Sequence, residues 1–117
     1  MSKSYYNNAL AGNSKMLCSF SNKGELLRLY WPNIDFLQHS EDFHIGISDK
    51  ARDESGGSAR WFHSDFTNFR QEYIPQTNII KTTYDSGDGL AISQLDYVIS
   101  DLDVLIRSFT IECISKE

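Results

Sequence analysis

The sequence has few cysteines and no long apolar run, and each of these two shortages excludes a class of protein. Only Cys18 and Cys113 occur among 117 residues, without Cys-x-x-Cys spacing, which excludes a disulfide-rich secreted scaffold. Both lie inside apolar runs and are expected to be buried reduced thiols, although antiparallel pairing of the two end strands would place them side by side. No apolar stretch approaches the roughly 20 residues that cross a bilayer, and the N-terminus lacks a signal-peptide layout. We therefore expect a cytoplasmic protein without a membrane partner.

Positive charge is also scarce. The chain has 11 Lys and Arg against 16 Asp and Glu, a net charge of −5, and its basic residues are scattered singly. Nucleic acid and anionic membrane surfaces are therefore not expected partners. The 40% hydrophobic and 13% aromatic content is typical of a folded chain, and 117 residues correspond to a single domain, residues 1–117.

Alternation of apolar and polar residues dominates the first half of the sequence. In KMLCSF (residues 15–20) Met16, Cys18 and Phe20 share one face, SNKG supplies a turn ending at Gly24, and ELLRLY (residues 25–30) follows. This order predicts a β-hairpin. The segment DFHIGIS (residues 42–48) alternates in the same way, and its pattern predicts a strand with Phe43, Ile45 and Ile47 inward and His44, Gly46 and Ser48 outward.

The middle of the chain differs in composition. Residues 49–59, DKARDESGGSA, contain five charges, two adjacent glycines and no large apolar residue, which is typical of a surface loop. The aromatic segment RWFHSDFTNFRQEYI (residues 60–74) is interpreted as strand, turn and strand, ended by Pro75, although its middle resembles a helical turn.

The last part predicts three consecutive strands: NIIKTTY (78–84), LAISQLDYVIS (90–100) and VLIRSFTIECI (104–114), joined by SGDG and DLD. About eight strands result, and no segment has the apolar period of a helix. The sequence thus predicts an all-β fold, an antiparallel β-sandwich rather than a closed barrel. The final strand is long and apolar, so its edge should be covered by more of a larger protein or by another chain. Self-association through this exposed edge or through a docking face is the second of these two alternatives.

No catalytic constellation emerges from the residue pattern. Glycosidase chemistry needs two carboxyl groups about 5 to 9.5 Å apart, and aromatic segments supply acids for such a pair, but exposed carboxylates or turn caps are the simpler interpretation. These acids are Asp35, Glu41, Asp42, Asp65 and Glu72. The spacing of His39, His44 and His63 matches no zinc motif, and Gly-x-Ser-x-Gly is absent. We expect no catalytic residue, no metal and no cofactor in this chain.

The two tryptophans are the remaining candidates. Trp31 has Pro32 and Asp35 near it in sequence, and Trp61 has Arg60 and Asp65. An aromatic ring flanked by hydrogen-bonding groups suits the apolar face and hydroxyl edge of a sugar, or anchors an interface. Packing inside a small core is the competing explanation.

Several segments resemble, in order, the start of bacterial glucoamylase-like enzymes of glycoside hydrolase family 15. The most specific are ALAGN (residues 9–13), YWPNID (30–35), QEYIPQTNII (71–80) and LIRSF (105–109). The resemblance covers nearly the whole chain. In that family such sequence forms an N-terminal antiparallel β-sandwich, part of a larger super-β-sandwich, ahead of an (α/α)6 barrel that carries both catalytic glutamates.

The resemblance implies a non-catalytic accessory domain or fragment that lacks the barrel, from an enzyme that cleaves α-glucosidic bonds of starch-type glucans. The chain alone is then inactive, and its partner is the catalytic barrel. Residues Trp31, Asp35, Gln38 and His39 of the connection YWPNIDFLQHSED are expected to brace that interface or reach the substrate cleft. Alternatively, Trp31 and Trp61 make the chain a stand-alone carbohydrate-binding module for an α-glucan.

Overall fold

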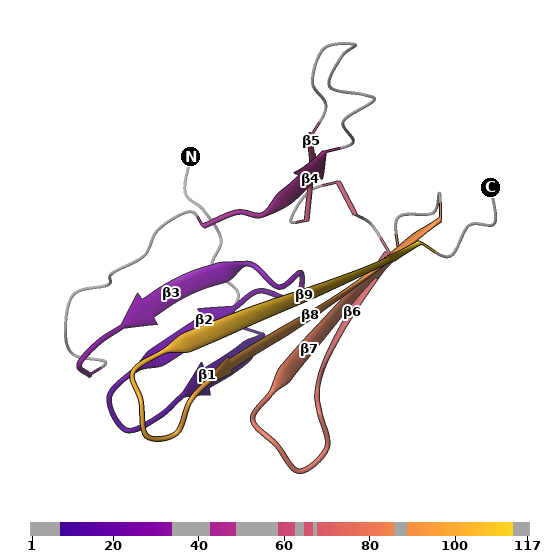
Figure 1. The fold of residues 1–117 in the computed structure, drawn as a ribbon. Coiled ribbons are helices and arrows are strands. Elements are labelled where there is room, and N and C mark those ends of the chain that lie inside the picture. Colours follow the sequence, from indigo (N-terminus) through magenta and orange to yellow (C-terminus); the bar gives the residue numbers. More distant parts are fainter. Residues whose placement is uncertain are drawn as a thin grey trace.

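The chain is an all-β protein, as the sequence predicts. A computed structural model describes residues 8–33, 43–48, 59–62, 65–66, 68–85 and 89–113, and these contain strands but no helix. The nine strands are β1 (Ala9–Gly12), β2 (Leu17–Phe20), β3 (Leu26–Tyr30), β4 (Gly46–Ser48), β5 (Ala59–Trp61), β6 (Asn68–Tyr73), β7 (Ile80–Asp85), β8 (Leu90–Val98) and β9 (Leu105–Cys113). They form antiparallel sheets in the orders β1-β2-β3, β4-β5 and β6-β7-β8-β9 (Figure 1).

The three-stranded sheet contains the predicted hairpin. β2 pairs with β3, and the turn between them includes Gly24, whose φ of 76° lies in the left-handed region that glycine adopts most readily. Met16, Cys18 and Phe20 are buried on one face, as the alternation predicts. The pairing register shifts between Ser19 and Phe20, which is a β-bulge.

β1 was not predicted as a strand. It pairs with β2 through Ala9↔Phe20 and Gly12↔Leu17, which adds a third strand before the predicted hairpin. Four residues rich in alanine and glycine carry little β-propensity, so the alternating pattern does not reveal them. This segment is a strand because it pairs with β2 and because the side chains of Ala9 and Ala11 are both buried.

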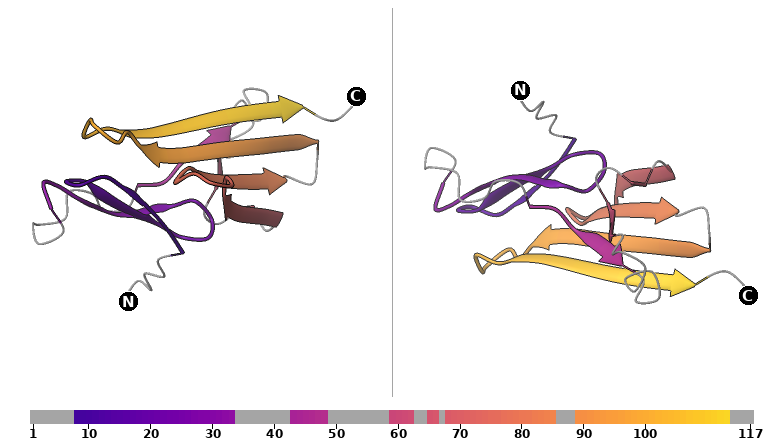
Figure 2. Two further views of the ribbon diagram at one scale, coloured as in Figure 1. Left: turned by 90° about the horizontal axis from the view of Figure 1, so that it is seen from below. Right: turned by 90° about the horizontal axis from the view of Figure 1, so that it is seen from above.

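The four-stranded sheet is the larger part of the fold. β6, β7, β8 and β9 form a meander in which each strand pairs with the next, so the predicted strands of the second half are confirmed. The three-stranded sheet covers one end of a face of this sheet, and the two-stranded sheet lies over the other end (Figure 2). This layered arrangement is compatible with the predicted sandwich.

Two apolar clusters join the layers. The first lies between the three-stranded sheet and the adjacent end of the four-stranded sheet, where Phe20 and Ile80 are completely buried. The second is aromatic: Phe62 and Phe66 pack on Tyr84 with ring centroids 4.9 and 5.7 Å away. The sequence placed these rings in a strand–turn–strand, and the turn after β5 carries them into the core.

Two expectations need correction. Phe43 was predicted to point inward, but 45% of its surface is exposed; it forms an isolated bridge to Leu26, and the Arg107 guanidinium lies 5.2 Å from the centre of its ring. Ile45 and Ile47 do pack on the aromatic cluster. The cysteines were expected to be buried and to meet if the end strands paired. Cys18 is buried in β2, whereas Cys113 is exposed in β9, and these strands belong to different sheets.

Candidate functional site

The first predicted site residue, Trp31, lies directly after β3 and is partly exposed. Its indole Nε1 donates a hydrogen bond to Asp103 Oδ2 over 2.8 Å, and 42% of its surface remains accessible. Trp31 is joined to Pro32 by a cis peptide bond. The ring is therefore not core filling: it is held at the surface by an acceptor from the β8–β9 turn, 72 residues away in sequence.

Asn13 ties the same turn to a second segment. Its Nδ2 donates to the carbonyls of Ile99 and Leu102, both over 3.0 Å, while its Oδ1 accepts from the backbone of Lys15 and Met16. One side chain thus closes the β1–β2 turn and holds the β8–β9 turn. Asn13 ends ALAGN, so two of the segments that carry the family resemblance, ALAGN and YWPNID, meet at this turn.

Trp61, the other predicted ring, ends β5 and lies over β4. Its register partner is Gly46, and a Cβ atom at that position would come within 2.8 Å of the indole. A glycine is therefore needed for the ring to lie against the strand. The ring is 43% exposed. The backbone N–H of Trp61 donates to Asp65 Oδ2 over 2.7 Å, which makes Asp65 a turn cap.

The structure does not combine these candidates into one site. Trp31 follows β3 and Trp61 ends β5, strands of different sheets whose C-terminal ends lie apart in both figures (Figures 1 and 2). Asp35, Gln38 and His39, like Glu41, Asp42 and His63, lie outside the described residues. Glu72 is a surface residue that pairs with Arg70 across 3.6 Å.

A buried polar network, which the sequence analysis missed, docks the β2–β3 turn on the four-stranded sheet. Arg107 Nη2 donates to the carbonyl of Gly24 over 2.6 Å, and Gln94 Nε2 donates to the same oxygen over 3.1 Å. The Tyr84 hydroxyl donates to the carbonyl of Lys23. Gln71 Nε2 reaches the carbonyl of Ser21 over 2.8 Å. The backbone carbonyls of the turn thus accept hydrogen bonds from side chains of four strands, β6, β7, β8 and β9.

Asp96 is the anionic centre of this network and is completely buried. It accepts from Arg107 Nε over 2.7 Å and from Gln94 Nε2 over 2.6 Å. Burial raises the pKa of Asp96 above its ordinary value of 3.8, and the Arg107 guanidinium acts in the opposite direction. Burial likewise raises the pKa of the Tyr84 hydroxyl and raises that of the Cys18 thiol to about 12.

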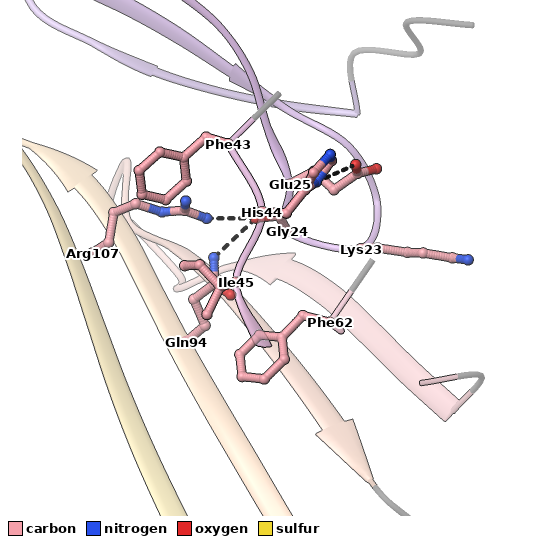
Figure 3. A pocket seen from close by; sticks show the side chains of 9 residues that line it. All are labelled: Lys23, Gly24, Glu25, Phe43, His44, Ile45, Phe62, Gln94 and Arg107. Carbon is pink, nitrogen blue, oxygen red and sulfur yellow. Dashed lines mark hydrogen bonds and ion pairs between the residues drawn. The ribbon is translucent and has the colours of Figure 1, made fainter. Parts of the chain in front are cut away.

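A shallow hollow opens above this network (Figure 3). It encloses about 200 Å³, open solvent included, between the β2–β3 turn, Phe43–Ile45 and the sheet. His44 Nδ1 lies 3.5 Å from Glu25 Oε2 on its rim. Ligand pockets usually enclose about 300 to 1,000 Å³, so this hollow is small even by an inclusive measure. Its polar groups mainly hold the turn.

The described residues contain neither a cluster of three metal-ligating side chains nor a helix long and apolar enough to cross a membrane. Three of the described acids have structural partners: Asp96 binds Arg107, Asp103 binds Trp31 and Asp65 caps a turn.

Comparison with known proteins gives one informative relative. The chain is 28% identical, over 102 residues, to an uncharacterized glycosyl hydrolase of Methanocaldococcus jannaschii. The match covers 87% of this chain but only 15% of the relative. No family model and no solved structure gives a significant match. The chain is thus related to a glycosyl hydrolase and spans a small fraction of that relative's length.

Proposed function

We propose that this chain is a non-catalytic N-terminal accessory domain of a glucoamylase-like glycoside hydrolase, which packs against and supports the catalytic barrel. The observation that carries the proposal is the uneven match to the glycosyl hydrolase relative: most of this chain corresponds to a small part of that protein. A segment of this size fits one module of a larger enzyme.

The arrangement of the polar residues supports a structural role. The most buried charges, Asp96 and Arg107, bind each other and the β2–β3 turn, so they stabilise the fold rather than face a substrate. Trp31 and Asn13 similarly fix the β8–β9 turn. Mutation of Trp31 in the complete enzyme should lower the melting temperature more than it raises the substrate KM. A large KM increase at unchanged melting temperature would place Trp31 at the substrate cleft instead.

The direct test is calorimetric titration of the 117-residue chain with maltose and maltoheptaose, with a parallel assay for released glucose. We expect neither binding nor release. Glucose release that disappears when one carboxylate is replaced would overturn the proposal. As a positive test, removal of the matching segment from the M. jannaschii relative should lower the melting temperature of the remaining protein; an unchanged melting temperature would contradict the supporting role.

A second candidate is a stand-alone module that binds α-glucan through Trp31 and Trp61. The observation that favours it is the exposure of both indoles, 42% and 43%. Because the two rings end strands of different sheets, each would act as a separate platform. Binding of maltoheptaose without glucose release, lost stepwise in Trp31→Ala and Trp61→Ala, would favour this candidate over the accessory domain.

A further inference from the structure

The outer strands of the sheets are protected to very different degrees. In the four-stranded sheet β6 forms one edge, and it is six residues long and followed by Pro75. Arg70 and Glu72 on this strand form an exposed pair, with side chains 77% and 54% accessible. Short length and exposed charge are common protections of a sheet edge against pairing with another chain.

The three-stranded sheet is protected by contacts. The backbone N–H of Leu10 donates to the Tyr73 hydroxyl over 2.9 Å, and that hydroxyl donates to the carbonyl of Leu10 over 3.2 Å. Tyr73 therefore occupies both polar backbone groups in the middle of β1. At the other edge, Leu26 at the start of β3 makes a bridge to Phe43.

β9 has fewer of these protections, and its exposed charge is Glu112 near the end of the strand. It is nine residues long, LIRSFTIEC, without proline, glycine or lysine. Its only cation, Arg107, has a side chain that is 10% accessible because it points inward to Asp96. Ile111 is 53% exposed, whereas its register partner on β8, Ile92, is 1% exposed. Within the described ranges no strand pairs with the outer edge of β9 (Figure 2).

We propose that β9 is a self-pairing strand, to which the β9 of a second copy of this chain adds in antiparallel orientation about a two-fold axis at Phe109. In this register Phe109 faces Phe109 of the second copy, and Ser108 faces Thr110. Aromatic pairs and hydroxyl pairs are favourable cross-strand neighbours. Arg107 faces Ile111 and Glu112 faces Ile106, so no like charges are opposed. The same surface serves both copies, as a two-fold interface requires.

The product is a continuous eight-stranded sheet made of two four-stranded sheets. A single strand pairing buries less surface than a standard interface, so we expect a dissociation constant on the order of 10–100 μM. The inference is independent of the proposed function, because it concerns the isolated chain and requires neither a barrel nor a sugar.

Sedimentation equilibrium of the 117-residue chain from 5 to 500 μM tests the dimer. The double variant Ser108→Lys/Thr110→Lys sets four lysines together across the proposed pairing and should weaken association at least tenfold. Asn68→Lys/Asn78→Lys adds the same charge at exposed positions of β6 and the β6–β7 turn, and should leave association within twofold. Far-UV circular dichroism and melting temperature establish that both variants are folded.

A wild-type chain that stays monomeric at 500 μM would overturn the proposal. So would a dimer that Ser108→Lys/Thr110→Lys leaves intact, or one that both variants weaken equally. Should the β9 variant fail to fold, hydrogen exchange of the wild type at 10 and 500 μM decides the matter. Amides within residues 105–113 that point to the outer edge should exchange about three to five times more slowly at the higher concentration, because the monomer fraction falls by that factor for the expected dissociation constant. Unchanged exchange of these amides would refute the pairing.

Discussion

Arg107 and Asp96 face each other on adjacent strands and join through a 2.7 Å hydrogen bond beneath the β2–β3 turn. The same guanidinium donates to the carbonyl of Gly24. One side chain therefore neutralises a buried carboxylate and holds a turn that is 83 residues distant in sequence. The docking of the two sheets depends on a charged pair as well as on apolar packing.

Removal of either Arg107 or Asp96 alone should lower the free energy of unfolding. Arg107→Met leaves the Asp96 carboxylate buried without its cation, and we expect a loss of about 3–5 kcal/mol in the free energy of unfolding. The double variant Asp96→Asn/Arg107→Met should be more stable than Arg107→Met alone, because no uncompensated charge remains. Urea denaturation measures both. As a control, Arg70→Met breaks an exposed pair and should cost less than about 1 kcal/mol.

The pH dependence of stability should reveal whether burial or the Arg107 guanidinium has the larger effect on the pKa of Asp96. Burial raises the pKa of Asp96 in the folded chain above its ordinary value of 3.8. At a pH between the ordinary pKa and the raised pKa, the folded state therefore binds more protons than the unfolded state. The wild-type free energy of unfolding, relative to that of Asp96→Asn, should therefore fall as pH rises from about 3.8 through the folded pKa and then level off. Urea denaturation from pH 3 to 7 checks this. A relative stability that rises with pH would mean that Arg107 outweighs burial.

Asn13 should be an important polar residue of the surface turns. Asn13→Ala removes donors to Ile99 and Leu102 and the acceptor of the Lys15 and Met16 amides, and we expect a loss of about 1–3 kcal/mol. Thermal unfolding measures the effect. Ser14→Ala, an exposed neighbour in the same turn, is the matched control and should change stability by less than about 0.5 kcal/mol. Equal effects would contradict the assigned role of Asn13.

The two thiols should react very differently. Cys18 is fully buried and its pKa is raised to about 12, so little reactive thiolate forms and reagent has no access. Iodoacetamide at pH 8 should label the exposed Cys113 in the folded chain and leave Cys18 unlabelled until denaturant is added. Mass spectrometry of tryptic peptides identifies the site. Labelling of Cys18 at a rate equal to that of Cys113 would show that the three-stranded sheet opens readily.

Local pattern and tertiary context contributed differently to the candidate site. The polar residues near Trp31 and Trp61 in sequence identified these two tryptophans as candidates. The composition around Asp65 predicted the turn there. The network around Asp96 was missed because Gln94 and Asp96 alternate with apolar residues in LAISQLDYVIS, where a polar residue usually faces solvent. Here these polar residues lie on the buried face, and their partners come from residues 21–24 and from β9.

The sequence by itself determined the all-β class, the hairpin around Gly24, the meander of β7 to β9 and the absence of helix-forming periodicity, because two-residue alternation and turn chemistry are local properties. Tertiary structure alone decided that Ala9–Gly12 is a strand, that Phe43 is exposed, that Asn13 and Trp31 meet the β8–β9 turn, and that Arg107 turns inward. β1 needs its pairing with β2, and the contacts of Trp31, Arg107 and Asn13 reach residues 72, 83 and 86 positions away. A buried polar group is stable only where such partners satisfy its hydrogen bonds.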